Sequence, residues 1–341
     1  MADRVARKFA RLVVLAGALS VAAAPSAAHD ESAGAAPSPA AAQSFEAWLG
    51  DLRAEAEAAG IGESTLDAAL DGLSPIPRVI ELDRKQPEFT QTFDEYMARR
   101  VTPELVEEGR RVFREQRALL TEIGGKYRVQ PRFIVALWGV ETRYGKSTGG
   151  FPVIAALATL AYDSRRSAYF RGELLAALKI VDQGHIEPAN MIGSWAGAMG
   201  QNQFMPSSFL RFAVDFDGDR RRDIWTTLAD VFASTAKYLS RSGWRGDQTW
   251  GREVRLPDGF DPALTGLGVV KRLSGWQRIG VRRTDGGDLP GRDLRASIVL
   301  PGGADGPAYV VHSNYRAILK WNRSDYFAVS VGYLADLIGS G

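Results

Sequence analysis

The most constraining feature of this 341-residue chain is an apolar segment at residues 133–145, FIVALWGVETRYG, which carries one carboxylate, Glu141. Apolar side chains recur along it at a spacing of three to four residues, which is typical of an amphipathic helix. Ile134, Leu137 and Trp138 lie seven, four and three residues before Glu141 and so share its face. The carboxylate is therefore expected to project from an apolar helix surface.

Two effects are expected to act on Glu141 in the same direction. Gly145 is a helix stop signal, which places Glu141 in the last turn, where the helix dipole disfavours negative charge. Burial among apolar neighbours also disfavours the charged form, so both effects predict a raised carboxyl pKa, as a general acid requires. The structural alternative is a Glu near a helix end that pairs with Arg143 or Lys146.

The N-terminus has the pattern of a secretory signal peptide over residues 1–28. Basic residues precede an apolar run at 12–24, and small residues at 26–28 offer a cleavage site. Residues 29–43 are rich in Ala, Ser and Pro and are predicted to form a disordered spacer. No later segment has the ~18 consecutive apolar residues of a membrane helix. We therefore expect a soluble periplasmic protein without a membrane span.

Charge and cysteine content exclude several classes of function. Removal of residues 1–28 takes four basic residues and Asp3 from totals of 42 basic and 40 acidic, which leaves 38 and 39 and a net charge of about −1. The basic character therefore belongs to the targeting segment, and no nucleic-acid partner is expected. Because the chain has no Cys, we expect no disulfide, no thiol chemistry and no lipoprotein anchor.

The periodic patterns predict a mainly α (α+β) protein. We expect an N-terminal helical region at 44–130, a helical core at 131–250, a small β subdomain at 251–312 and a C-terminal helical segment at 313–341. Pro75 and Pro77 predict an extended connection. The longer predicted helices are 88–99, 103–123, 131–144, 153–162, 167–182, 206–212, 228–240, 315–320 and 326–338.

A second unusual segment, GSWAGAMGQNQFMP at residues 193–206, consists largely of small residues. Such a loop lets a bulky ligand approach the backbone closely. Trp195 and Phe204 offer apolar faces on which a sugar ring could lie. Amides suited to binding hydroxyls and acetamides follow one another at Gln201, Asn202 and Gln203. The alternative is a tight connection between helices that contains a buried Trp.

The two segments GVETRYG and SWAGAMGQNQFMPSSF resemble the lytic murein transglycosylase B family (glycoside hydrolase family 103), and the resemblance extends over residues 45–338. It implies a lysozyme-like helical core with additional N-terminal helices and a small β insertion. It also implies cleavage of the MurNAc-GlcNAc β-1,4 bond of peptidoglycan glycan strands without water, forming 1,6-anhydro-MurNAc ends, with Glu141 as the single acid/base. The resemblance further implies that the cleft is lined by Ser194, Met199, Gln203, Tyr238, Trp321 and Asn322.

A single carboxylate sets this chain apart from typical glycosidases, which place two acids across the scissile bond. The acids nearest in sequence are expected at helix ends or on solvated faces: Asp163, Glu173, Asp182 and Glu187. A lytic transglycosylase needs no second acid, because the C6 hydroxyl of the muramic acid attacks and one glutamate first gives and then takes a proton.

Two alternatives to this function stay open at this stage. A goose-type lysozyme would hydrolyse the same bond with water, and a non-catalytic scaffold would bind peptidoglycan without cleaving it. Beyond the glycan strands, partners among cell-wall synthesis or division proteins are left open.

A third motif, DFDGDRRRD at residues 215–223, resembles part of an EF-hand calcium loop. Some members of the resembled family carry calcium there, although no cofactor is required for the chemistry. Arg220 occupies the position of the invariant Gly of an EF-hand loop, and Thr226 occupies that of the Glu that binds calcium through both oxygens. Asp230 could supply a late ligand. The alternative is a solvated turn tied by Asp–Arg pairs. The candidate calcium ligands are Asp215, Asp217, Asp219 and Asp223.

Overall fold

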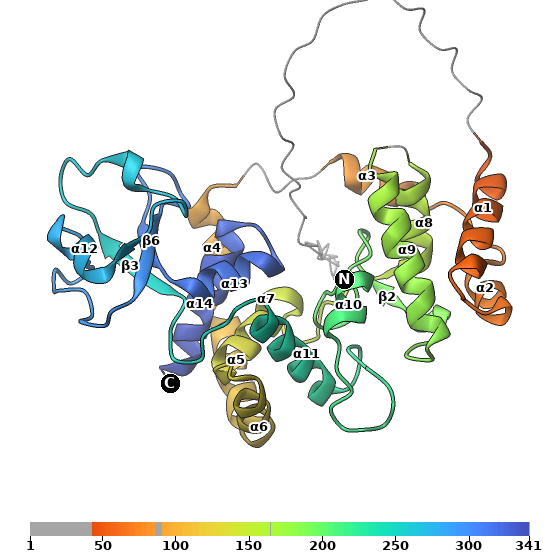
Figure 1. Ribbon diagram of the computed structural model, residues 1–341, viewed down its shortest axis with the longest axis horizontal. Helices are drawn as coiled ribbons and strands as arrows, with labels where there is room; N and C mark the ends of the chain where they lie inside the picture. The colour runs from red at the N-terminus through yellow and green to blue at the C-terminus, as the bar shows by residue number, and fades with distance from the viewer. Residues whose placement is uncertain (1–42, 86–90, 164, 341) are drawn as a thin grey trace, which may run out of the picture.

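The computed structural model describes residues 43–85, 91–163 and 165–340 (Figure 1). The predicted signal peptide and nearly all of the predicted spacer, residues 1–42, lie outside the described residues. Among the described helices, none combines the length and the apolar composition that crossing a bilayer requires.

The helices form two groups, each around its own hydrophobic core. The first group, on the right of Figure 1, joins the N-terminal helices to the middle of the chain. Its members are α1 (Phe45–Ala58), α2 (Glu63–Leu70), α3 (Pro77–Arg84), α8 (Val153–Tyr162), α9 (Ser167–Asp182) and α10 (Pro206–Phe212). The second group contains α4 (Phe93–Arg100), α5 (Pro103–Glu115), α6 (Arg117–Tyr127), α7 (Pro131–Thr142), α11 (Leu228–Arg241), α13 (Ser313–Trp321) and α14 (Asp325–Gly339).

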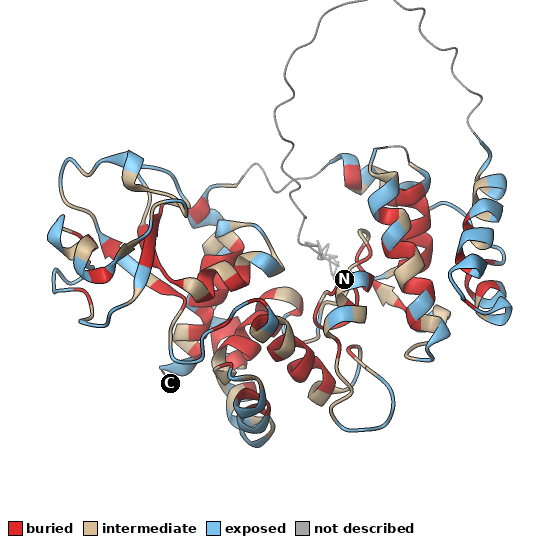
Figure 2. Ribbon diagram, viewed as in Figure 1, coloured by how far each residue is buried: buried red, intermediate tan, exposed pale blue. Residues whose placement is uncertain are grey.

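The sequences of α7 and α8 explain why these helices lie at the centres of the two groups. Both are apolar around most of their circumference, a composition that is stable only when the helix is surrounded by others. Every residue of α8 before Tyr162 is buried (Figure 2). α7 packs against α5, α6, α11 and α14, so Glu141 is carried by a helix that neighbours hold from several sides.

A small β region lies between α11 and α13 in the sequence and on the left of Figure 1. Its antiparallel sheet has the strand order β4-β6-β7-β3-β5 and covers a core that contains the buried Trp276 of α12 (Leu273–Arg278). The strands are β3 (Gly251–Arg255), β4 (Lys271–Arg272), β5 (Arg282–Arg283), β6 (Arg295–Val299) and β7 (Ala308–Val311). The predicted mainly α class with a small β insertion is thus confirmed.

A shorter pairing lies beside the first helical group. β1 (Phe151–Pro152) and β2 (Ile192–Gly193) form a two-residue antiparallel ladder in which Phe151 pairs with Gly193. The 3-10 turn at Pro188–Asn190 precedes β2, and a second one at Pro262–Leu264 lies in the β region.

One predicted connection and two predicted helices differ from the observed elements. The expected extended connection at Pro75 and Pro77 stops at Ile76, whose backbone is extended, because Pro77 begins α3, where a proline without an N–H is tolerated. The helix predicted over 103–123 is divided at Gln116 into α5 and α6. The helix predicted from residue 88 begins at Phe93, after a Thr92 capping box, and residues 88–90 lie outside the described residues.

Candidate active site

The end of α7 places Glu141 at the surface of the second helical group. The helix ends at Thr142, two residues earlier than predicted, because Arg143 and Tyr144 adopt left-handed conformations with φ of 51° and 59°. Glu141 therefore lies in the last turn, as expected. Lys146, one of its two proposed ion-pair partners, instead binds Glu108 with an Nζ to Oε1 distance of 3.1 Å.

The Gly-rich loop at 193–206 is fastened to this helix end. The indole of Trp138 donates to Gln201 Oε1 at 2.8 Å, and the Thr142 hydroxyl donates to the Gln201 carbonyl oxygen at 3.1 Å. The Asn202 amide donates to Val231 O at 2.8 Å and to Thr235 Oγ1 at 2.7 Å. Gln201 and Asn202 thus hold the loop against α7 and α11, so the expectation that they bind substrate hydroxyls is not supported.

Small residues in the loop serve close backbone packing. A Cβ added at Gly193 would lie 2.2 Å from the carbonyl oxygen of Ala198, a distance that no side chain tolerates. Gly200 has a φ of 61° and carries the turn between Met199 and Phe204, whose backbones pair. The glycines therefore shape the loop itself rather than opening its backbone to a ligand.

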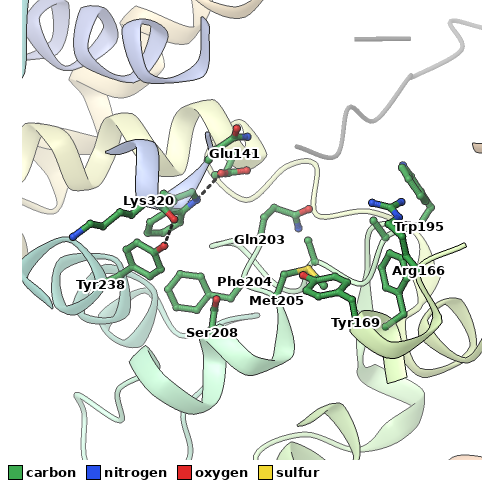
Figure 3. A pocket seen from close by; sticks show the side chains of 15 residues that line it. Glu141, Arg166, Tyr169, Trp195, Gln203, Phe204, Met205, Ser208, Tyr238 and Lys320 are labelled. Carbon is green, nitrogen blue, oxygen red and sulfur yellow. Dashed lines mark hydrogen bonds between the residues drawn. The ribbon is translucent and has the colours of Figure 1, made fainter. Parts of the chain in front are cut away.

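A cleft runs between the two helical groups (Figure 3). One side comes from α7, α11 and α13, and the other from α9 and the loop before α10. The lining residues are Glu141, Arg166, Tyr169, Phe170, Trp195, Ala196, Ala198, Gln203, Phe204, Met205, Ser208, Tyr238, Lys320, Trp321 and Asn322.

Glu141 is the only carboxylate among the described residues that line this cleft. Its side chain is half-buried, and its Oε1 accepts a hydrogen bond of 2.7 Å from the indole Nε1 of Trp321 (Figure 3). Trp321 is 180 residues away along the chain, so the contact joins the end of α13 to the end of α7.

An aromatic cluster surrounds the Trp321 indole. Its ring centroid lies 5.1 Å from that of Phe204 and 4.7 Å from that of Tyr238. The Tyr238 hydroxyl donates to the carbonyl oxygen of Lys320, and burial raises the pKa of Tyr238 to about 12. Tyr238 is therefore neutral at physiological pH, and the cluster forms an apolar platform beside the acid.

Two amide side chains on the cleft wall are held in fixed orientations. Gln203 Nε2 donates to Thr148 O at 3.0 Å and to Gly200 O at 2.9 Å, so the side-chain carbonyl is the group it can offer a ligand. Asn322 Oδ1 accepts from the backbone N–H of Ser324 at 3.0 Å, which leaves its amide N–H groups as donors.

Ser194 and Met199, which the resemblance placed on the cleft surface, lie beneath it. Ser194 is 1% exposed and its hydroxyl accepts from the Ala198 N–H at 3.0 Å. Met199 is 0% exposed and packs in the core of the first helical group. Both therefore support the loop that carries Gln203 and Phe204.

The far wall of the cleft contains residues that sequence reasoning missed, among them Arg166 and Tyr169 at the start of α9. The Arg166 guanidinium forms an ion pair with Asp83 and lies 4.9 Å from the Phe170 ring centroid. The basic pair at 165–166 before an apolar helix was the available signal, but nothing in the sequence linked it to Glu141.

Glu173 is buried, contrary to the expected helix end or solvated face. It is 5% exposed and accepts hydrogen bonds from the Ser207 N–H at 2.9 Å and the Ser207 hydroxyl at 2.7 Å. Its negative charge thus lies at the N-terminus of α10, where the helix dipole stabilises it. It supports α10 below the cleft and does not line the cleft.

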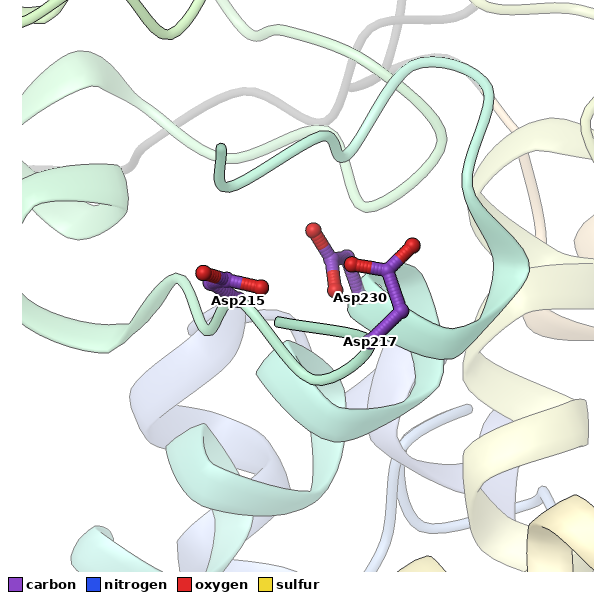
Figure 4. A group of neighbouring side chains, drawn as sticks. All are labelled: Asp215, Asp217 and Asp230. Atoms are coloured by element: carbon purple, nitrogen blue, oxygen red, sulfur yellow. The ribbon is translucent and has the colours of Figure 1, made fainter. Parts of the chain in front are cut away.

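The acidic loop brings two of the four expected aspartates, Asp215 and Asp217, together with Asp230, the possible late ligand. Carboxylate oxygens of Asp215, Asp217 and Asp230 lie within 4.8 Å of one another (Figure 4). Asp230 is 0% exposed, and its burial, aided by the charges of Asp217 and Asp215, raises its pKa to about 6. Asp219 and Asp223 lie outside this group, and like its members they accept hydrogen bonds from backbone N–H groups.

A mainly α fold with one carboxylate beside an aromatic-lined cleft defines a lysozyme-like glycosidase of the lytic transglycosylase class. The comparisons agree with this class. The chain belongs to the transglycosylase SLT domain family, whose sequence profile matches residues 44–336. The resemblance inferred from GVETRYG and SWAGAMGQNQFMPSSF is therefore confirmed.

Individual relatives are similar over most of the described chain. The chain is 33% identical over 256 residues to membrane-bound lytic murein transglycosylase B of Escherichia coli (strain K12). The aligned region covers 71% of this chain and 66% of that protein, which is just under two thirds of its length. SltB3 from Pseudomonas aeruginosa, solved in complex with NAG-anhNAM-pentapeptide, is 47% identical with a TM-score of 0.85 and covers 88% of this chain and 80% of its own.

A third relative bears on the acidic loop. The lytic transglycosylase Slt35 of Escherichia coli, solved in complex with calcium, is 28% identical with a TM-score of 0.73. The similarity covers 85% of this chain and 91% of that one.

Proposed function

We propose that this protein is a peptidoglycan lytic transglycosylase that cleaves the MurNAc-GlcNAc β-1,4 bond and leaves 1,6-anhydro-MurNAc ends. The observation that carries the proposal is the single carboxylate, Glu141, among the described residues lining the cleft. Hydrolysis by a pair of carboxylates requires a second acid across the bond. One carboxylate suffices when the substrate supplies the nucleophile.

The reaction balances with Glu141 alone. Glu141 donates its proton to the glycosidic oxygen as the bond from that oxygen to C1 of MurNAc breaks. The C6 hydroxyl of the same MurNAc then bonds to C1 and gives its proton to the Glu141 carboxylate. The enzyme ends in its starting protonation state, and no water is consumed.

The walls of the cleft fit the two faces of an amino sugar. The half-buried rings of Tyr238 and Trp321, which the buried Phe204 supports from behind, suit the C–H face of a sugar ring. The Gln203 carbonyl accepts and the Asn322 amide donates, which suits the acetamide and hydroxyl groups. Mass spectrometry of the muropeptides released from purified sacculi tests the proposal.

We propose that the protein acts in the periplasm, after export by the signal peptide at residues 1–28, with residues 131–250 as its catalytic core. The E. coli relative is named membrane-bound, whereas this chain contains no Cys for a lipid anchor. Fractionation of cells expressing the full chain is the measurement that checks this location.

We also propose that the acidic loop holds a structural calcium ion. Three carboxylates within 4.8 Å of one another repel each other, and the pKa of Asp230 is raised mainly by burial and to a smaller extent by that repulsion. A divalent cation with oxygen ligands would relieve it. Arg220, at the place of the EF-hand glycine, adopts the left-handed conformation that this turn needs, with a φ of 73°.

Calcium added to chelator-treated protein at pH 7.5 should raise the melting temperature by several degrees. A ligand at 100 times its Kd stabilises the folded state by about 2.7 kcal/mol, and each kcal/mol is worth roughly 2–4 °C in a chain of this size. Asp217→Asn should remove the gain, and Asp258→Asn, in the β region, should keep it. Differential scanning calorimetry measures the shift, and an unchanged melting temperature at millimolar calcium would favour the solvated turn.

Asp219→Asn distinguishes the two candidate ligand sets. If Asp215, Asp217 and Asp230 bind the ion, this variant keeps most of the calcium-dependent gain. If the EF-hand-like set from the sequence binds it, the gain is lost.

A further inference from the structure

The contact between Trp321 and Glu141 has a chemical direction. An indole N–H is a donor only, so the bond of 2.7 Å makes Glu141 Oε1 the acceptor. A donor directed at Oε1 is best satisfied when the acidic proton sits on the other oxygen, Oε2. It also stabilises the negative charge that remains after the proton has left.

We infer that Trp321 is a positioning residue, whose indole N–H holds Glu141 Oε1 and directs the acidic proton to Oε2 for transfer to the substrate. This inference rests on the proposed function, in which Glu141 acts first as acid and then as base. It gives Trp321 a role beyond that of a sugar platform.

The surroundings of Trp321 hold its indole in one place. Phe204 and Tyr238 pack on its ring, with centroid distances of 5.1 and 4.7 Å, and Tyr238 donates to the carbonyl oxygen of the preceding residue, Lys320. Trp321 also packs against the cores of both helical groups. A donor held in one place restricts the rotation of the carboxylate that it binds. The carboxyl group is therefore already oriented for proton transfer when the substrate binds.

The cations that line the cleft have partners of their own. Of the cations lining the cleft, Arg166 pairs with Asp83, and the Lys320 ammonium donates to Ser242 O at 2.8 Å. The remaining titratable groups of the lining are Tyr169 and Tyr238, and burial raises the pKa of both. Near the end of α7, Lys146 pairs with Glu108 and Arg143 is exposed. Among the described residues that line the cleft, Glu141 is thus the only carboxyl group.

Trp321→Phe keeps an aromatic ring and removes the N–H. Without the donor the Glu141 carboxylate is less stable, so the protonated form persists to higher pH. The alkaline limb of the kcat profile should therefore move up by about one pH unit, the order expected for a lost charge-assisted hydrogen bond. At the wild-type optimum, kcat should fall roughly tenfold. Trp48→Phe, on α1 outside the cleft, is the control and should change neither value.

Replacement of Trp321 by benzothienylalanine provides a second variant, because it keeps the shape of the indole and replaces the N–H by sulfur. It should reproduce the shift of the limb even if Trp321→Phe folds poorly. The inference is overturned if the wild type releases anhydro products while the folded Trp321 variants keep the wild-type kcat and alkaline limb. A wild type that releases no anhydro products contradicts the proposed function instead.

Measurements of substrate affinity distinguish a Trp321 that positions Glu141 from a Trp321 whose N–H binds the sugar. Calorimetry with a NAG-NAM muropeptide should give the same Kd, within about twofold, for Glu141→Gln and for Glu141→Gln combined with Trp321→Phe. A loss of tenfold or more in the double variant would mean that the indole N–H acts on the sugar, and the positioning role would be wrong.

Discussion

Glu141→Gln is expected to reduce the release of muropeptides from sacculi by at least ~10²-fold, the scale of general acid–base catalysis. The amide has nearly the shape of the carboxyl group but no proton that it can give and take back. Its carbonyl oxygen can still accept the bond from Trp321 Nε1. The effect should therefore fall on kcat, with the melting temperature close to that of the wild type.

Glu108→Gln is a matched control for this variant. Glu108 belongs to α5 and pairs with Lys146 and Arg111 outside the cleft, so its loss should leave lysis nearly unchanged. Binding of Glu141→Gln to insoluble sacculi, measured by co-sedimentation, should be retained. Near-wild-type lysis by Glu141→Gln would remove Glu141 from the mechanism. It would favour the alternative in which this protein is a non-catalytic scaffold that binds peptidoglycan while another enzyme cleaves it.

Local patterns were sufficient to predict most of the helices and the position of the acid. The boundaries of α8, α9 and α10 agree with their predicted ranges because proline and small polar residues mark their starts clearly. Glu141 could be selected because an isolated carboxylate interrupts an otherwise apolar helix. Both inferences use neighbours within about ten residues along the chain.

The rest of the site depends on contacts between distant segments. Nothing local indicates that Trp321 reaches Glu141 across 180 residues, or that Arg166 faces the same cleft. The aspartates of the acidic loop were chosen by their spacing, but Asp230, on α11, joins Asp215 and Asp217 only after the loop has folded back onto that helix. Glu173 was assigned to a surface because the Ser207 N–H that it binds is 34 residues away.

The released muropeptides are expected to end in 1,6-anhydro-N-acetylmuramic acid, lighter by one water than the products of a lysozyme. The reason is that the C6 hydroxyl of the sugar, and not a water molecule, is the nucleophile that this cleft can use. The described cleft contains no carboxylate besides Glu141 that could activate a water on the opposite face of the sugar or form a covalent intermediate. The C6 hydroxyl is already part of the sugar that reacts.

That hydroxyl has an advantage over water that is large enough to decide the product. Holding two reacting groups in one molecule is worth up to about 7–11 kcal/mol of the barrier when the geometry is right, and even half of that corresponds to a preference of roughly several hundredfold or more. After protonating the leaving oxygen, Glu141 is the carboxylate base on the cleft wall that can take the C6 proton. Digestion of sacculi in water labelled with heavy oxygen, followed by mass spectrometry, measures the outcome directly. Products with a reducing end that carries the label would show that water is the nucleophile, and the goose-type lysozyme alternative would then describe this cleft.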